Sequence, residues 1–176
     1  MKTCFLDIEF SNLDADFGVI LSAAIKPYGK PVKIFYISKE RPWDDREVVL
    51  QTVQELNAFD IVVTFYGYKA DIPYLRTRLL KHDPIGKISI KPSLHHIDLY
   101  YTAKQKLKMH SNSLDVITNF FGIKGKTHLN GEMWARAAAG DELGLKYVVY
   151  HNKYDVIILE KVYDILKDHV GQIRMI

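Results

Sequence analysis

Cysteine, long apolar runs and strongly charged segments are nearly absent from this sequence. Cys4 is the only cysteine among the 176 residues, so no internal disulfide can form and we expect a cytoplasmic location. No apolar run approaches the roughly 20 residues of a membrane-spanning helix, which argues against a membrane protein. Asp7 and Glu9 interrupt the apolar start too early for a secretory signal. No Cys/His spacing matches a structural zinc site.

What remains indicates one globular domain over residues 1–176. Hydrophobic residues make up 48% of the chain, which is enough for a core and too many for a disordered protein. The formal net charge of +3 permits binding to nucleic acid but does not demand it. The chain contains no internal repeat, low-complexity segment or linker that would divide it.

Alternating and β-branched segments predict the strands. Residues 4–10, 18–28 and 32–37 are separated by short links and predict an antiparallel meander of three strands. Residues 60–65 are short and β-branched, as in a buried strand, and residues 96–99 predict a further short strand.

Helical spacing predicts five helices, over residues 43–59, 72–81, 113–122, 131–139 and 143–169. We expect Asp44 or Asp45 to cap the first of them. Leu80 in the second helix, and Tyr150 and Ile165 in the last, are expected on the apolar faces. Together the segments predict an α/β domain with a mixed sheet flanked by helices.

Four acidic residues stand in apolar surroundings, where an uncompensated charge is costly. Asp7 and Glu9 are two apart on a predicted strand and therefore point to the same face. Asp71 opens the second helix, and Asp155 lies in the middle of the last, where aspartate has poor propensity. If the four carboxylates converge, divalent cations can neutralise them.

Each acid also has a simpler interpretation that the sequence leaves open. Asp7 and Glu9 can lie on a solvated strand face, Asp71 can be a helix N-cap, and Asp155 can face solvent. His151 lies four residues before Asp155, on the same helical face, and is the better-placed group to handle a water there. A surface charge pair with Asp155 is its alternative role. Tyr150 points away unless the helix is kinked.

Phosphodiester hydrolysis suits this set of residues. Two hard cations with oxygen ligands, Mg²⁺ or Mn²⁺, can activate water and stabilise the leaving oxygen. A neutral imidazole can accept the proton from water near neutral pH.

The three motifs resemble those of the DEDD 3′-5′ exonucleases. FLDIE (5–9) is similar to the first motif, DIPYLRTR (71–78) to the second and HNKYDV (151–156) to the third, and HIDL (96–99) is similar to an Asp-Leu pair after the second motif. The resemblance is greatest to the proofreading domains of family B DNA polymerases and to stand-alone relatives. It implies an RNase H-like fold, metal ligation by Asp7, Glu9, Asp71 and Asp155, and release of nucleoside monophosphates from the 3′ end of single-stranded DNA or RNA.

Two departures from the family pattern keep other functions open. Members usually carry Tyr four residues before the last Asp or His five before it, whereas this chain has His151 and Tyr150. The second motif lacks the usual upstream Asn and the aromatic residue before its Asp, with Tyr66 or Gly67 and Ala70 in those places. A catalytically weak or inactive nucleic-acid-binding module and a structure-specific endonuclease are therefore the alternatives.

Basic and aromatic residues can hold a single strand through phosphate contacts and base stacking. Phe10 can wedge against a terminal base or pack in the core. Tyr100 and Tyr101 lie near a second basic region. The basic side chains are Arg76, Arg78 and Lys81, followed by Lys104, Lys106, Lys108, Lys124 and Lys126. Each of them can also be an ordinary solvated charge.

Overall fold

The computed structural model describes residues 1–125, 127, 130–171 and 174–175. Its strands are β1 (Thr3–Phe10), β2 (Ile20–Pro27), β3 (Lys33–Tyr36), β4 (Ile61–Thr64), β5 (His95–Asp98) and β6 (Arg174–Met175). Its helices are α1 (Arg46–Leu56), α2 (Asp71–His82), α3 (Leu99–Lys106), α4 (Leu114–Phe120), α5 (Gly131–Ala138) and α6 (Glu142–Leu166), followed by a 3₁₀ turn at Lys167–His169.

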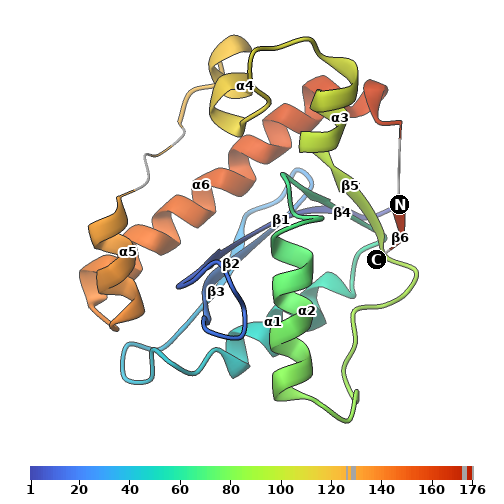
Figure 1. Ribbon diagram of the computed structural model, residues 1–176. Coiled ribbons are helices and arrows are strands. Elements are labelled where there is room, and N and C mark those ends of the chain that lie inside the picture. The colour runs from blue at the N-terminus through green and yellow to red at the C-terminus, as the bar shows by residue number, and fades with distance from the viewer. Residues whose placement is uncertain (126, 128–129, 172–173, 176) are drawn as a thin grey trace.

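The strands form one mixed sheet in the order β3-β2-β1-β4-β5-β6 (Figure 1). β1, β2 and β3 pair antiparallel, and β6 pairs antiparallel with β5. β4 runs parallel to both of its neighbours, β1 and β5. The carboxyl ends of β1, β4 and β5 therefore lie at one edge of the sheet, which is where ligand sites gather in open α/β sheets.

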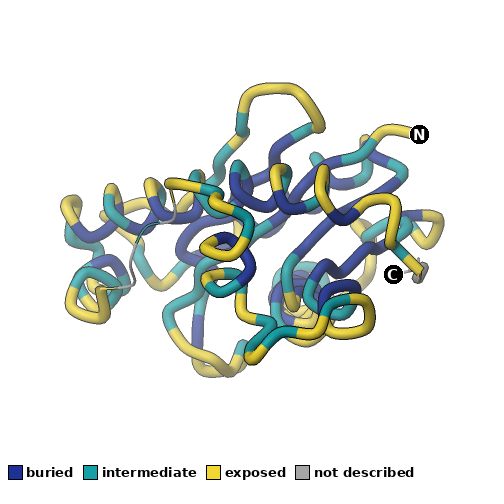
Figure 2. The backbone as a smooth tube through the Cα atoms, turned by 90° about the horizontal axis from the view of Figure 1, so that it is seen from above, coloured by how far each residue is buried: buried dark blue, intermediate teal, exposed yellow. Residues whose placement is uncertain are grey.

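Helices cover both faces of the sheet. In Figure 1, α6 crosses one face, while α1 and α2 lie on the opposite face. Successive side chains of β1 point to opposite faces of the sheet. Leu6 and Ile8 belong to the core under α1 and α2, whereas Phe5 packs with Val156 of α6. Figure 2 shows the buried backbone running through the middle of the molecule and the exposed backbone in the outer loops. Asp7 and Glu9 continue the row that Phe5 begins, so they face α6.

The predicted fold class is confirmed, with its three-strand meander, its parallel strands and its flanking helices. α3 and β6 were not predicted. The prediction that Leu80 faces inward is wrong, because its side chain is 58% exposed at the outer surface of α2. Tyr150 and Ile165 are likewise exposed, because the buried stripe of α6 runs one position away, through Val148, Asn152 and neighbours. Among the described residues, no helix combines the length and apolarity needed to cross a membrane.

Candidate metal centre

β1 and α6 bring together three of the predicted site residues. Glu9 projects from the end of β1, and His151 and Asp155 project from one face of α6. The His151 Nε2 atom lies 3.8 Å from Glu9 Oε1 and 3.5 Å from Asp155 Oδ2. One oxygen or nitrogen of each of the three residues lies within 4.8 Å of the others. This set can hold a cation.

Two contacts that do not involve the carboxylates hold the ring of His151 in its orientation. Its Nδ1 atom is hydrogen-bonded to the hydroxyl of Thr127, and Trp134 packs edge-on against the ring with centroids 5.1 Å apart. His151 is only 5% exposed, whereas Tyr150 is 52% exposed and packs against Tyr154. Because α6 is continuous through this segment, the imidazole faces the carboxylates and the Tyr150 phenol does not.

Asn152, which sequence reasoning did not assign to the site, holds Asp7 in position. Its side-chain amide donates to Asp7 Oδ2 at 2.7 Å and to the Asp7 carbonyl at 3.0 Å. Its own oxygen accepts a hydrogen bond from Ser22 on β2. Asn152 is fully buried on α6 next to the buried His151, and a polar pair on a largely apolar helical face is the sequence signal that could have identified it.

Asp71 approaches from the opposite face of the sheet. It is the first residue of α2 and is not its N-cap, because Ala70 occupies that position. Its Oδ1 atom accepts a hydrogen bond from the backbone N–H of Ile8 at 2.9 Å, which places the carboxylate beside Asp7. The side chain is 5% exposed. The capping interpretation of Asp71 is therefore wrong.

The electrostatics of Asp7 reflect a concentration of negative charge. Burial raises the pKa of Asp7 well above its ordinary value. The charges of Glu9, Asp155 and Asp71 raise this pKa further. The hydrogen bond from Asn152 lowers it only in part. In the absence of a cation, the cluster therefore favours a protonated Asp7.

Asp71 shows the same effect. Burial raises its pKa from 3.8 to about 7, and the charge of Asp98 acts in the same direction, while the bond from Ile8 opposes it. Strongly perturbed pKa values cluster at functional sites. Oxygen donors of this kind fit Mg²⁺ or Mn²⁺, because binding such an ion removes the repulsion that raises the pKa values.

Asp98 anchors the loop that carries Asp71. It is the N-cap of α3, where its side chain accepts from Tyr100 N. The same carboxylate accepts from the backbone N–H groups of Tyr66 at 2.8 Å and Tyr68 at 3.0 Å. The loop between β4 and α2 is thus fixed to the end of β5.

One predicted nucleic-acid contact is wrong. Arg78 is 1% exposed and forms a bidentate pair with Asp45, with bonds of 2.8 and 2.7 Å. Asp45 stands at the N-cap position of α1, but its side chain makes no cap hydrogen bond and instead binds Arg78, His82 and Ile20 N. The prediction that Asp45 can occupy the N-cap position of α1 is therefore confirmed, whereas the expected capping hydrogen bond from its side chain is not formed.

The remaining basic and aromatic candidates divide between surface and core. Phe10 stacks on Tyr74 with ring centroids 4.4 Å apart, so its ring packs within the protein. The exposed basic side chains are Arg76, Lys81, Lys104, Lys106, Lys108 and Lys124, whereas Lys126 lies outside the described residues.

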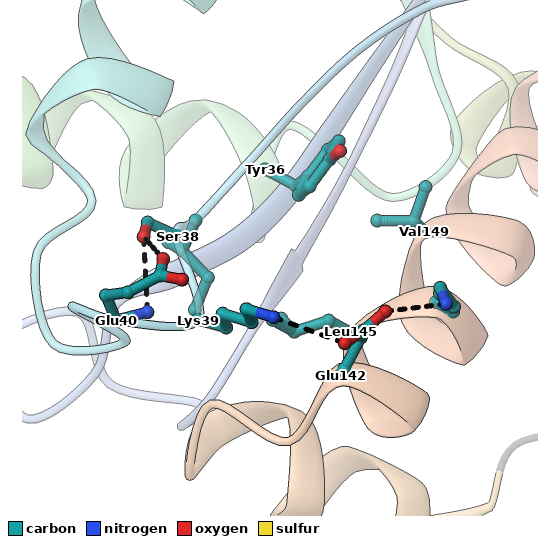
Figure 3. Close-up of a pocket in the computed structure, with 9 residues that line it drawn as sticks. Tyr36, Ser38, Lys39, Glu40, Glu142, Leu145 and Val149 are labelled. Atoms are coloured by element: carbon teal, nitrogen blue, oxygen red, sulfur yellow. Dashed lines mark hydrogen bonds and ion pairs between the residues drawn. The ribbon is translucent and has the colours of Figure 1, made fainter.

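A groove of about 350 Å³ lies elsewhere, between the segment after β3 and the first turns of α6 (Figure 3). Tyr36 and Val149 flank it, and Lys39 reaches across to Glu142 with their charged groups 3.2 Å apart. None of the predicted site residues lines this groove. This groove is therefore not the predicted site, and the candidate centre is identified by its converging carboxylates instead.

Fold and site together define the class of this protein. A model of the RNase H superfamily matches residues 4–167, and the chain belongs to that superfamily. Membership and the partly buried cluster of Glu9, His151 and Asp155 support a nuclease-type activity that uses divalent metal.

Two relatives are DNA polymerases. A DNA polymerase of Methanocaldococcus jannaschii is 25% identical over 129 residues, which cover 63% of this chain and 8% of the polymerase. The solved structure of the family B DNA polymerase from Pyrobaculum calidifontis matches 93% of this chain and 24% of its own, with a TM-score of 0.67 and 18% identity. The second likeness shows the fold alone, and this chain spans a small part of both relatives.

Proposed function

We propose that this chain is a 3′-5′ exonuclease of the DEDD type, which shortens single-stranded DNA or RNA and releases nucleoside monophosphates. The observation that carries the proposal is the approach of carboxylates from β1, α2 and α6. Glu9 and Asp155 cluster with His151, whose Nε2 atom lies 3.5 Å from Asp155 Oδ2, and the charges of Glu9, Asp155 and Asp71 all act on Asp7. Residues 1–176 are proposed to form one domain, and a cytoplasmic location remains a prediction from the single cysteine.

A pair of Mg²⁺ or Mn²⁺ ions, which would activate water and neutralise the phosphate, is proposed to be held by Asp7, Glu9, Asp71 and Asp155. The structure of the site supports this in its donor chemistry: all four side chains offer oxygen, and the first carries a raised pKa through its neighbours.

His151 is proposed to accept the proton of the attacking water. In that role Nδ1 carries the proton of the neutral ring, and its N–H donates a hydrogen bond to the Thr127 hydroxyl. The lone pair of Nε2 then faces the carboxylates. A hydrogen-bonded ring that cannot rotate keeps Nε2 in place for each turnover. Asn152 and the Ile8 N–H hold Asp7 and Asp71, and these contacts fix the carboxylates before substrate binds.

The test is hydrolysis of a 5′-labelled single-stranded oligonucleotide with Mg²⁺ or Mn²⁺. We expect a ladder of products shortened from the 3′ end, which Asp7→Ala and Asp155→Ala abolish. Asp168→Ala, which removes an exposed carboxylate beyond α6, serves as the matched control and should keep full activity.

Two further substrates separate the alternatives. A 3′-blocked oligonucleotide should stall the enzyme, and internal cleavage of it would instead identify an endonuclease. Metal-dependent binding of nucleic acid without cleavage of DNA or RNA would identify an inactive binding module. Full activity of both alanine variants would overturn the proposed site.

A further inference from the structure

Four tyrosines, two of them exposed and two partly buried, form one aromatic cluster at the carboxyl edge of the sheet. Tyr66 and Tyr68 lie in the loop after β4, and Tyr100 and Tyr101 lie in the first turn of α3, after β5. The ring of Tyr66 lies 4.8 Å from that of Tyr100, and the ring of Tyr68 lies 6.2 Å from that of Tyr101. Tyr66 and Tyr68 are 45% and 41% exposed. We call these four residues the tyrosine platform.

The platform adjoins the candidate metal centre. The loop that carries Tyr66 and Tyr68 runs directly into Asp71, and the Asp98 carboxylate fixes this loop to the end of β5 by accepting from Tyr66 N and Tyr68 N. Since β1, β4 and β5 are parallel neighbours, the platform extends the row of strand ends that begins at the carboxylates. The rings therefore lie next to the place that the end of a substrate strand would occupy.

The backbone that presents the rings is held in an unusual conformation. Tyr66 has a φ of +64°, a left-handed value that is rare for an aromatic residue. A side chain at the next residue, Gly67, would meet Thr64 Oγ1 at 2.5 Å, so only glycine fits there. The Asp98 carboxylate accepts a hydrogen bond from Tyr66 N, which fixes this loop, and another from Tyr100 N, which fixes the turn that carries Tyr100 and Tyr101. Strain that the surroundings maintain in this way is typical of ligand-binding sites.

Positive charge borders the rings. The Lys69 ammonium lies 5.9 Å from the Tyr68 ring centroid and that of Lys104 lies 5.8 Å from the Tyr100 centroid. Lys106 and Lys108 are exposed further along the same segment. Aromatic rings beside lysines match the two parts of a single-stranded nucleic acid, since each base can stack on a ring while each phosphate meets a cation. A duplex would keep its bases inside the helix and could not use the rings.

We propose that the tyrosine platform stacks the unpaired bases just upstream of the nucleotide that lies at the carboxylates. The direction of the strand in this proposal, with its 3′ end at the carboxylates, rests on the proposed nuclease function. The platform would then be the element that selects single strands over duplexes. A protein segment rich in aromatic or apolar residues is the competing occupant.

The experiment measures binding of a fluorescein-labelled oligo(dT) or oligo(U) 12-mer by anisotropy, with Ca²⁺ in place of Mg²⁺, and of a matched duplex. We expect the double variant Tyr66→Ala/Tyr101→Ala to weaken single-strand binding by about tenfold or more, because stacking on one ring contributes a similar factor. Tyr66→Phe/Tyr101→Phe, which keeps both rings, should bind within twofold of the wild type. Tyr36→Ala, which removes a more exposed tyrosine from β3, is the control.

Lys104→Glu adds a readout that does not depend on the fold of the loop. Because Lys104 is exposed, we expect this variant to fold normally and to lower the salt dependence of single-strand binding by roughly 0.7 in the log–log slope. In turnover assays the double alanine variant should raise KM and leave kcat within twofold.

The outcomes separate the two proposals. Loss of single-strand binding in the alanine variant of a protein that hydrolyses nothing would support the platform and overturn the nuclease. Unchanged KM and binding in a protein that hydrolyses single strands would overturn the platform alone. Equal loss of single-strand and duplex binding, or wild-type salt dependence in Lys104→Glu, would also overturn the platform and favour a protein partner.

Discussion

The side-chain amide of Asn152 donates a hydrogen bond to Asp7 Oδ2 at 2.7 Å, and this bond fastens the middle of α6 to β1. Through it, two segments 145 residues apart in the chain bring their acidic groups together. The proposed metal ligation by Asp7 depends on that attachment.

Replacing Asn152 with alanine should therefore damage both stability and activity. The variant leaves buried groups of Asp7 and Ser22 without their partner, which costs about 1–3 kcal/mol in the free energy of unfolding. With Asp7 no longer oriented, activity should fall by roughly 10–100-fold. Urea unfolding and oligonucleotide hydrolysis measure the two effects. Asn119→Ala, at an exposed position of α4, is the control. Wild-type activity in Asn152→Ala would contradict the positioning role.

The raised pKa of Asp71 predicts how stability depends on pH. Between the ordinary value of 3.8 and about 7, the folded protein keeps a proton that the unfolded chain has lost. The free energy of unfolding of the metal-free protein should therefore fall as the pH rises through this range. Asp71→Asn removes the titration and retains an oxygen for Ile8 N. We expect this inactive variant to melt above the wild type at pH 8 in EDTA, and the two to converge near pH 4. A lower melting temperature at pH 8 would contradict the assignment.

Separate substitutions of His151 and Tyr150, the two neighbouring candidates for the general base, should affect kcat very differently. His151→Ala should lower kcat by about 100-fold or more, because Nε2 faces the carboxylates. Tyr150→Phe should change kcat less than twofold, since its ring lies outside with Tyr154. The reverse ranking would assign the base to Tyr150.

The Asp45–Arg78 pair predicts a contrast between two arginines of α2. Arg78→Ala leaves a fully buried carboxylate without its bidentate partner and should destabilise the protein by about 3–5 kcal/mol. Arg76→Ala, at an exposed position two residues earlier, should change stability by about 0.5 kcal/mol or less. Chemical unfolding compares them, and equal stabilities would show that the ion pair is not a structural element.

The sheet and most helices could be predicted because their signals are local. Alternation marks the meander, and β-branched residues mark β4. α3 escaped prediction because its start depends on Asp98, a cap that becomes visible only when β5 is known to end there. The face of α6 was misjudged because Asn152 interrupts the apolar stripe that periodicity follows.

The site was predictable as a set of acids and not as a set of contacts. Spacing within a strand or helix relates Asp7 to Glu9 and His151 to Asp155, because those geometries are fixed by the backbone. Nothing local relates Asp71 to Ile8 or Asp45 to Arg78, since these contacts arise only when α1 and α2 pack on the sheet. Arg78 therefore looked like a surface cation until the packing was known.

The most direct test of the shared metal centre is a crystal of the protein grown with MnCl₂ and measured at the manganese absorption edge. We expect two anomalous peaks between the carboxylates of Asp7, Glu9, Asp71 and Asp155, beside His151 Nε2. A map without a peak at this position, from a protein that nonetheless cleaves nucleic acid with Mn²⁺, would contradict it.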